Sequence, residues 1–542
     1  MNGAAVIAEI LKREGTEFLS CYPRNPLIEA SAALDIRPIL CRQERVGVGI
    51  ADGYSRIKRG KRNGVFAAQA GPGIENAFPG VAQAFSENVP LLVIAGGMPL
   101  GRQYVRPVFR AANVFQPVTK WSALAHSVQE LPGLLRRAYH AMRSGKAGPV
   151  LIEVPDEVFT AEYQGPLDYA PVSLQRAAPD PAAVKKAAEM LLAAKQPLLW
   201  AGQGVHYAEA SEQLAALAEL LPAPVVATNP GKSAIADSHP LALGAATRSR
   251  SKMFADFMSR ADLILAIGSS LTVTNFGPAV PPSKTIIHSS NDPSDINKEY
   301  RADHALVGDA ALVIDALITE LSHRKSGSGD NTLAALKADI AAGKKAWLDE
   351  WSKHLSSDEI PINQYRVIRD LMRTLDRDNV IITHDSGSPR EQLLPFWETT
   401  GQVDPAWIRA RHHYGRQTRS SEKIVCQRDG RRRNRHDRHG HRDGGSQSHR
   451  HPHRRLQQRS DGGRARRAKT FDQEVRRSDC QRQLRQGGRG TQRRLDTGRE
   501  ARRDRTRDQG CGRRHGNRCT VSARIRRQGR LRLLALLLND GG

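Results

Sequence analysis

The sequence predicts a multi-domain α/β protein whose parallel sheets are flanked by helices, followed by an arginine-rich stretch. Between residues 1 and 400, short apolar runs that end in Gly, Asn, Asp or Pro alternate with helical stretches. Continuous apolar runs indicate strands buried on both faces, and intervening helices make the strands parallel. Beyond residue 400 the apolar runs give way to arginine. Ligands in such sheets bind beyond the carboxyl ends of the strands, so we expect the site there.

The expected strands follow one another at helix-length intervals. In chain order they are Pro38–Cys41, Val65–Gln69, Leu91–Ile94, Val150–Val154, Leu198–Gln203, Val225–Asn229, Leu263–Gly268, Thr285–His288 and Val380–His384.

Changes in composition suggest the domain boundaries. A Pro-rich polar stretch covers 163–180, and 325–331 contains Ser-Gly-Ser-Gly, which is typical of a linker. The third domain is expected to start near Asp358 with a helix over Asn363–Leu375. The predicted units are a first domain at 1–165, a middle domain at 180–325, the start of a third domain at 358–400 and a tail at 401–542.

The net charge belongs to the tail alone. The chain has 542 residues, 82 Lys and Arg, 56 Asp and Glu, and a formal charge of +26. From residue 401 onward there are 38 Arg, 2 Lys, 11 Asp and 3 Glu, which already gives +26. The first 400 residues are therefore neutral. High charge with few core-forming residues predicts that the tail is disordered.

Secretion and membrane spanning are not expected. The N-terminus lacks a basic stretch followed by an apolar run, and no window approaches about 18 consecutive apolar residues. We therefore expect a cytoplasmic protein. Cys21 and Cys41 are the only cysteines before the tail. They are too few for a disulfide framework, and buried free thiols are the simpler interpretation.

Two segments carry most of the chemical information. In Arg42–Arg56 (RQERVGVGIADGYSR), Glu44 falls at a strand-to-helix turn, and a helix of small residues follows. In Ala70–Asn76 (AGPGIEN), a strand runs into a glycine loop at a helix N-terminus, where a flat ligand or an anion can approach the backbone closely. Taken alone, Glu44 is an ordinary helix-start carboxylate and Gly71-Pro72-Gly73 an ordinary tight turn.

Together these segments resemble the pyrimidine-binding domain of thiamine-diphosphate-dependent enzymes, in the acetolactate synthase-like branch. The resemblance extends over about residues 1–400 and implies the three-domain architecture of that family. Further matching stretches are Cys21–Pro23, Asn76–Ala84, Gly148–Pro155, Gly231–Ser233, His239–Leu241, Ala261–Gly268, Asn291–Pro293 and Val307–Ala310.

The resemblance assigns roles to five residues. Glu44 matches the glutamate that hydrogen-bonds the aminopyrimidine ring and favours the imino tautomer, which removes the C2 proton of the thiazolium. Pro23 and Asn76 match positions near the pyrimidine ring. Gly71 and Gly73 match the loop beside it.

One segment departs from the acetolactate synthase pattern. Those enzymes carry Phe-Gln-Glu before a Thr-Lys pair, whereas this chain has Val108–Asn113 (VFRAAN) before Thr119-Lys120. The departure leaves acetolactate formation open. It also leaves open the bound FAD that acetolactate synthases retain.

The resemblance breaks off near residue 400. The family's third domain binds Mg²⁺ and the diphosphate through Gly-Asp-Gly or Gly-Asp-Ala and a later asparagine. No such pair occurs here, so the sequence offers no metal ligand, although Thr383–Arg390 and Phe396–Glu398 resemble the start of that domain. Read one nucleotide further on, codons for 430–444 permit Gly-Asp-Ala-Ala-Ile-Gly, and those for 456–459 permit Phe-Asn-Asn-Gly. We interpret the chain from about Gly401 as an out-of-frame translation of the diphosphate-binding domain.

The competing interpretation is an evolved basic tail that binds nucleic acid through its phosphates. Evolved basic tails commonly mix Lys with Arg, whereas shifted GC-rich codons generate arginine. The histidines within His436–His453 follow no metal-ligand spacing, and Cys511 and Cys519 lie in the same out-of-frame stretch.

The resemblance implies an enzyme that decarboxylates a 2-oxo acid and transfers or releases the acyl or aldehyde unit. Its cofactors would be thiamine diphosphate and Mg²⁺, and it would act as a homodimer or homotetramer. A decarboxylase of the oxalyl-CoA or benzoylformate type is the alternative enzyme. A nonfunctional remnant is the alternative of another class, because the chain as written lacks the diphosphate motif.

Overall fold

A computed structural model describes residues 1–248, 251–275, 277–324, 330–384 and 387–400. It also describes the backbone of four strands at 408–409, 424–429, 517–527 and 530–540. The chain divides into two compact units, of which 433–515 lies wholly outside the described residues. The other tail residues, including the histidine-rich stretch and Cys511, also lie outside them, so the expected disorder of the tail stays a prediction.

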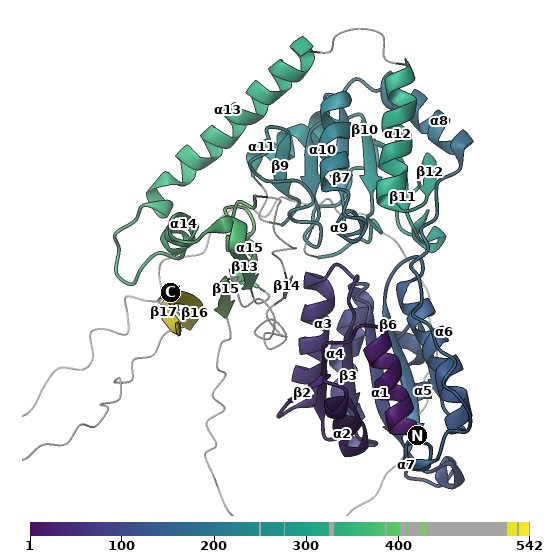
Figure 1. Ribbon diagram of the computed structural model, residues 1–542. Coiled ribbons are helices and arrows are strands. Elements are labelled where there is room, and N and C mark those ends of the chain that lie inside the picture. Colours follow the sequence, from purple (N-terminus) through teal and green to yellow (C-terminus); the bar gives the residue numbers. More distant parts are fainter. Residues whose placement is uncertain are drawn as a thin grey trace, which may run out of the picture. The chain divides into compact units, whose positions relative to one another are not determined.

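The first domain is built on a six-stranded parallel sheet with the order β2-β1-β3-β4-β6-β5 (Figure 1). Its strands are β1 Phe18–Tyr22, β2 Arg37–Leu40, β3 Gly64–Ala68, β4 Leu91–Gly97, β5 Trp121–Leu124 and β6 Pro149–Pro155. Its helices are α1 Gly3–Arg13, α2 Asn25–Ala33, α3 Glu44–Ile57, α4 Pro72–Ser86, α5 Ala111–Val114, α6 Leu131–Arg143 and α7 Asp156–Thr160.

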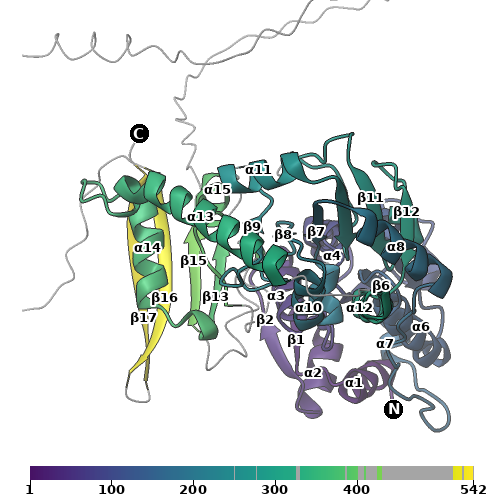
Figure 2. The same cartoon turned by 90° about the horizontal axis from the view of Figure 1, so that it is seen from above.

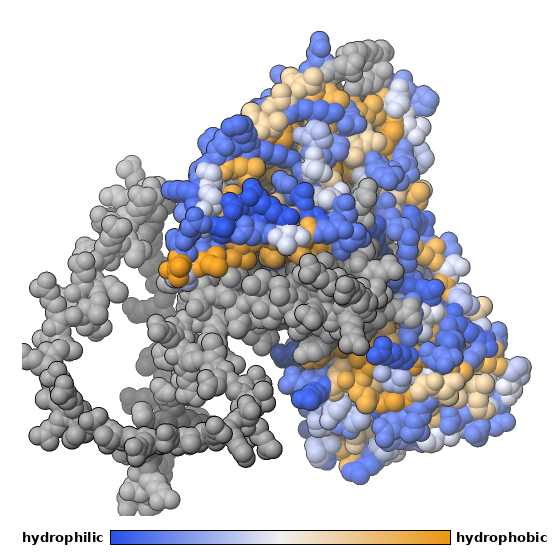
Figure 3. All heavy atoms as spheres, turned by 60° about the vertical axis from the view of Figure 1, so that its left-hand side comes forward, coloured by the Kyte–Doolittle hydropathy of each residue, from blue (hydrophilic) through white to orange (hydrophobic). Residues whose placement is uncertain are grey.

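Apolar side chains pack on both faces of this sheet. On β3, Val65 and Ala67 join the cluster formed with α1 and α6, whereas Phe66 and Ala68 join the cluster formed with α3 and α4. Side chains alternate along a strand, so each face of the sheet has its own core. In the view of Figure 3, hydrophilic residues occupy most of the described surface and apolar residues form smaller patches.

The middle domain repeats the arrangement with the strand order β12-β11-β10-β7-β8-β9, again parallel throughout (Figure 2). Its strands are β7 Pro197–Ala201, β8 Val225–Ala227, β9 Ala242–Ala245, β10 Leu263–Ile267, β11 Thr285–Ser290 and β12 His304–Val307. Its helices are α8 Pro181–Ala193, α9 Gly204–Ala208, α10 Ser211–Leu220, α11 Lys252–Arg260 and α12 Ala310–Arg324. The two parallel sheets confirm the predicted α/β class.

The third segment packs around aromatic rings. It contains the long helix α13 Asp330–Leu355, then α14 Gln364–Thr374, β13 Val380–His384 and α15 Ser388–Leu393. Phe396 stacks on Trp347 of α13, with ring centroids 5.4 Å apart, and contacts Tyr365 of α14. Asn363 caps α14 by accepting a hydrogen bond from the Tyr365 amide at 3.0 Å, which explains where this helix begins.

Four backbone strands complete a third sheet, with the order β14-β13-β15-β16-β17. They are β14 Ile408–Arg409, β15 Ile424–Asp429, β16 Asn517–Arg527 and β17 Arg530–Asp540. β14 and β15 run parallel to β13, whereas β16 runs antiparallel to its neighbours. Part of the arginine-rich stretch is therefore described as strand.

A buried charge cluster fixes the last turn of α3. Arg56 lies 2.7 Å from Asp52 Oδ1, one turn earlier, and 2.6 Å from Glu87 Oε2 after α4. The three side chains are mostly buried, which a lone charge would not tolerate. The two carboxylates thus hold the carboxyl end of α3 against the segment after α4.

Candidate active site

The site lies at the carboxyl edge of the first sheet, where Glu44 begins α3. Gln43 before it has an extended backbone, and a carboxylate in the first turn is favoured by the helix dipole. The Ser20 hydroxyl lies 2.9 Å from the Gly47 carbonyl oxygen and 3.0 Å from that of Val65, so it joins α3 to β1 and β3. The start of α3 is therefore fixed on the sheet.

Glu44 is buried without a partner. Its exposed fraction is 6%, and among the described residues no hydrogen bond or ion pair reaches its carboxylate. Neither carboxylate oxygen is among the fully buried atoms that lack a partner, so both oxygens keep some solvent exposure. This carboxylate is therefore arranged to meet a polar group from outside the described chain.

The glycine loop brings the start of α4 up to Glu44. Gly71 caps α4 with φ at +64°, a conformation that favours glycine. A methyl group added at Gly73 would stand 3.5 Å from Glu44 Oε1, whereas one added at Gly71 would meet no atom within 4 Å. The loop thus leaves open space beside the buried carboxylate.

Pro23 and Asn76 are not linked directly to Glu44 among the described residues. Pro23 follows β1 and is half-buried, and Asn76 is exposed on the second turn of α4. No hydrogen bond joins either of them to Glu44 among the described residues. Their roles beside the pyrimidine remain predictions.

The cysteines near the site are buried, free thiols. Burial raises the pKa of the Cys21 thiol to about 12. Burial also raises the pKa of the Cys41 thiol to about 11, and the nearby Glu44 carboxylate raises it further. A thiol that stays protonated is a poor nucleophile, which agrees with the structural role expected of both.

Sequence reasoning missed Glu153 at the same edge. It lies in β6 with an exposed fraction of 1%, and its Oε2 accepts a hydrogen bond from the Ala112 amide at 2.8 Å. Its Oε1 has no partner among the described residues, and burial raises the pKa of the carboxyl group. An acid inside the apolar run Val150–Val154 was the signal that could have revealed it.

Comparison with known proteins supports one family. Residues 1–123 match the description "Thiamine pyrophosphate enzyme, N-terminal TPP binding domain", and 184–317 match "Thiamine pyrophosphate enzyme, central domain". The probable acetolactate synthase large subunit of Methanocaldococcus jannaschii is 30% identical over 427 residues, which cover 74% of this chain and 69% of that protein. The probable 2-ketoarginine decarboxylase AruI of Pseudomonas aeruginosa is 34% identical over 431 residues, covering 76% and 75%.

The chain belongs to the thiamine pyrophosphate enzyme family. Its similarity to acetolactate synthase large subunits places it in the acetolactate synthase-like branch. Glu44, Gly71 and Gly73 of this thiamine pyrophosphate enzyme fit the pyrimidine half of the cofactor, which is flat and needs a hydrogen-bonding carboxylate. The partnerless Glu44 carboxylate and the open space above Gly71 are the observations that show the fit.

A second cavity lies at the carboxyl edge of the middle sheet. It has a volume of about 700 Å³ and is lined by the ends of β7, β8 and β10 and by residues of the first domain. Each cation in its lining is already paired with a carboxylate: Arg59 and Lys61 with Glu209, Arg143 with Glu14, Lys146 with Asp295, and Arg176 with Asp309. We assign no step to FAD.

The metal site of the family is likewise not found in the described part. Among the described residues, no three His, Cys, Asp or Glu side chains are grouped so that they could hold a metal ion. No residue of this chain is therefore assigned to Mg²⁺.

Within the described ranges, no helix has the length and apolar character needed to cross a membrane.

Proposed function

We propose that this protein is a thiamine-diphosphate-dependent enzyme that decarboxylates a 2-oxo acid and then transfers or releases the acyl or aldehyde unit. The observation that carries the proposal is Glu44, a buried carboxylate without a partner beside a glycine loop. When bound, thiamine diphosphate supplies a carbon nucleophile for the keto carbon of the substrate.

The residues of the chain would orient the cofactor and exchange one proton with it. Glu44 would exchange a proton with the ring nitrogen of the pyrimidine through Oε1 or Oε2, because no other described group competes for either oxygen. Gly71 and Gly73 would let the ring lie flat against the backbone at the start of α4. The buried surroundings of Glu44 would exclude water from this contact and so strengthen it.

We further propose that the site is completed by a second copy of the chain in the cytoplasm, as a homodimer or homotetramer. Two apolar side chains at the edge that carries Glu44 support this: Tyr22 at the end of β1 is 41% exposed, and Leu40 at the end of β2 is 68% exposed. Large apolar groups exposed beside a functional site are typical of a surface that a partner covers.

We also propose that the chain as written does not turn over, because its diphosphate-binding segment is out of frame and Mg²⁺ therefore has no ligands. Sequencing the gene across the codons for 395–460 tests this directly. The proposal is wrong if the alternative frame does not encode Gly-Asp-Ala and a downstream Asn-Asn.

Calorimetry tests cofactor binding in two proteins, the chain as written and the chain with its reading frame restored. We expect Mg²⁺-dependent thiamine diphosphate binding in the micromolar range only for the restored chain. Micromolar binding by the chain as written would refute its inactivity. In the restored chain, Glu44→Gln should abolish release of carbon dioxide from 2-oxo acids while circular dichroism stays unchanged. Normal turnover by this variant would remove Glu44 from the mechanism.

The alternative activity is simple decarboxylation without transfer to a second carbonyl compound. The similarity to the probable 2-ketoarginine decarboxylase and the departure at 108–113 both favour it. Product analysis of the restored enzyme separates the two, because a decarboxylase releases an aldehyde and a synthase releases a larger hydroxy-oxo acid.

A further inference from the structure

A positively charged segment crosses the edge of the sheet that carries Glu44. Between Asn88 and Gln129 there are three arginines and one lysine, but no Asp or Glu. Lys120 precedes β5 and donates to the Ser144 carbonyl oxygen. The three arginines, Arg102, Arg106 and Arg110, all follow β4, at the carboxyl edge.

Arg110 is the arginine whose backbone is fixed in place. The next residues form α5, in which the Ala112 amide donates to Glu153 of β6, and the Ser122 hydroxyl donates to the Ala112 carbonyl at 2.6 Å. Phe115 at the end of α5 packs edge-on against Phe78 of α4, with ring centroids 5.0 Å apart. The segment is thus tied to β6 and to the helix that begins beside Glu44.

The guanidinium of Arg110 is available to a ligand. Its side chain is half-buried and lies over the ring of Tyr104, 5.4 Å from the centroid, and this tyrosine is 86% exposed. Neither Arg110 nor Arg102 nor Arg106 forms an ion pair with any described residue. Glu153 lies close enough to interact electrostatically with Arg110, but only its Oε2 is hydrogen-bonded, to the Ala112 amide, and no ion pair joins the two side chains.

The topology places this cation within reach of a substrate at Glu44. Gly73 follows β3 and Glu153 lies in β6, with β4 between them. Neighbouring strands are about 4.8 Å apart, so roughly 10 Å separates β3 from β6. An arginine side chain and a short carbon chain together span such a gap.

The geometry points to Arg110 as a specificity residue that binds a second anionic group of the substrate, beyond the 2-oxo carboxylate. A planar guanidinium is matched to a carboxylate or a similar oxyanion, because two parallel hydrogen bonds form between them. The reaction of the bound substrate rests on the proposed function, whereas the preference for a second anionic group does not. It favours 2-oxo dicarboxylic acids over monocarboxylic acids and disfavours substrates with a cationic end.

Direct binding tests this on the full chain without thiamine diphosphate. The probes are 2-oxoglutarate and 2-oxopentanoate, which have equal carbon number and differ by one carboxylate, and 5-guanidino-2-oxopentanoate, which carries a cation. We expect 2-oxoglutarate to bind at least about tenfold more tightly than 2-oxopentanoate in ligand-observed NMR titrations, which is the effect of one well-placed charged contact. The cationic probe should bind most weakly. Added salt should reduce the preference.

Two variants complete the test. Arg110→Gln should abolish the preference and improve binding of the cationic probe. Arg137→Gln is the matched control, since Arg137 also lies over an aromatic ring, Trp121, but belongs to α6; it should keep the preference. Equal binding of both acids, no binding of 2-oxoglutarate, or an unchanged preference in Arg110→Gln would each overturn the inference.

The restored-frame enzyme gives a second readout. There, Arg110→Gln should raise KM for the dicarboxylic acid towards KM for 2-oxopentanoate. If thiamine diphosphate does not bind but the preference persists in NMR, the proposed function fails and the charge inference stands. If the restored enzyme turns over both acids without any preference, the proposed function stands and the charge inference fails.

Discussion

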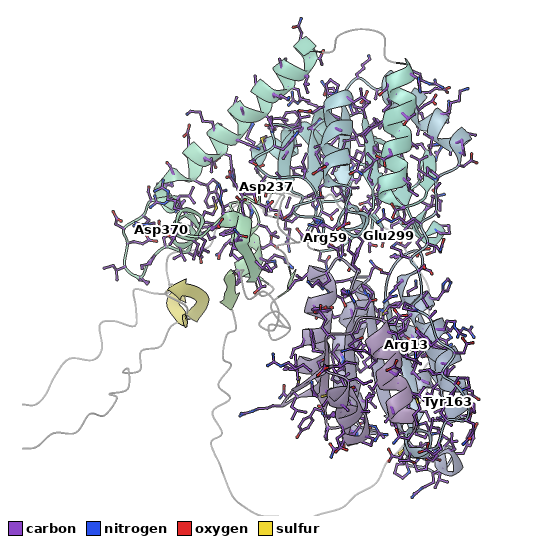
Figure 4. The ribbon with its side chains drawn as sticks, in the orientation of Figure 1. Arg13, Arg59, Tyr163, Asp237, Glu299 and Asp370 are labelled. Carbon is purple, nitrogen blue, oxygen red and sulfur yellow. The ribbon has the colours of Figure 1, made fainter. Side chains whose placement is uncertain are left out.

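Asp237, labelled in Figure 4, is joined to Thr399 by three hydrogen bonds across 162 residues of sequence. The Thr399 amide and hydroxyl both donate to Asp237 Oδ2 at 2.8 Å, and the Asp237 amide donates to the Thr399 carbonyl at 2.9 Å. The same carboxylate oxygen lies 2.7 Å from Nζ of Lys232, which is 2% exposed. One aspartate thus neutralises a buried cation of the middle domain and holds the third segment on it.

Asp237→Ala should destabilise the protein strongly, because it leaves the Lys232 ammonium buried without its carboxylate. Breaking such a pair costs about 3–5 kcal/mol. Urea unfolding followed by tryptophan fluorescence measures the change. Asp256→Ala is the control, since its pair with Lys252 is exposed and should contribute less than about 1 kcal/mol. Equal effects of the two substitutions would contradict the role given to Asp237.

Gly47→Ala should destabilise the first domain by about 1–3 kcal/mol through overpacking. The new methyl group would stand 2.5 Å from Phe66 Cε2, on the sheet that α3 covers. In α6, Gly133→Ala meets no atom within 4 Å and should stabilise by roughly 0.5–1 kcal/mol, because alanine favours a helix. Thermal unfolding of both variants tests this pair. An unchanged melting temperature in Gly47→Ala would show that α3 does not pack closely on Phe66.

Acidification should weaken the middle domain through His206. Burial lowers the pKa of this histidine to about 4, and its Nε2 lies 2.9 Å from the Lys232 carbonyl oxygen. Between pH 6.5 and 4 the unfolded chain binds a proton that the folded chain does not. The unfolding free energy should therefore fall by on the order of 3 kcal/mol across this window and not above it.

His206→Gln removes that titration while leaving a side-chain N–H for the carbonyl. Unfolding curves at pH 7 and pH 4.5 should show a smaller pH effect in this variant than in the wild type. The same slope in both proteins would assign the acid sensitivity to other groups.

Glu153→Gln should stabilise the first domain at neutral pH. Burial raises the pKa of Glu153, so the folded state favours its neutral form. The stabilisation that comes from this raised pKa is complete when the pH is below the pKa of Glu153 in the unfolded chain. It is lost as the pH rises through the pKa of Glu153 in the folded chain. An amide keeps the hydrogen bond from Ala112 without a charge, so the melting temperature should rise at pH 8 and hardly change at pH 4.

Glu157→Gln is the matched control for this test. Glu157 also accepts a backbone hydrogen bond, from Leu100 at 2.6 Å, but it is exposed. Its replacement should not increase stability at pH 8. A gain equal to that of Glu153→Gln would point to overall charge as the cause.

Of the strands that the sequence predicted, all but β2 lie in the interior of their sheets. Every continuous apolar run corresponds to a strand, and Val380–His384 matches β13 residue for residue. In the first two sheets four strands were missed, β1, β5, β9 and β12; the last three lie at the edges of their sheets, whereas β1 lies between β2 and β3. Edge strands are only partly covered, as β5 is along its whole length, so their sequences lack a continuous apolar run.

The residues of the candidate site also divide into those that the sequence could predict and those that it could not. Glu44 and the glycine loop could be predicted because both lie at strand-to-helix turns that have a recognisable sequence. Glu153 was marked only by its place inside an apolar run, and its contact could not be predicted, since its partner Ala112 is 41 residues away. Asn76 matched by sequence position, but the position of its side chain depends on the pitch of α4 and on the partner surface.

Helix α3 has a consequence for how the site comes into being. Its 14 residues include three glycines, and 12 are buried. Each glycine disfavours an isolated helix by about 1 kcal/mol relative to alanine, so residues 44–57 would not be helical on their own. The position of Glu44 is thus a product of the completed core, and a peptide copy of the motif would hold no geometry to recognise a cofactor.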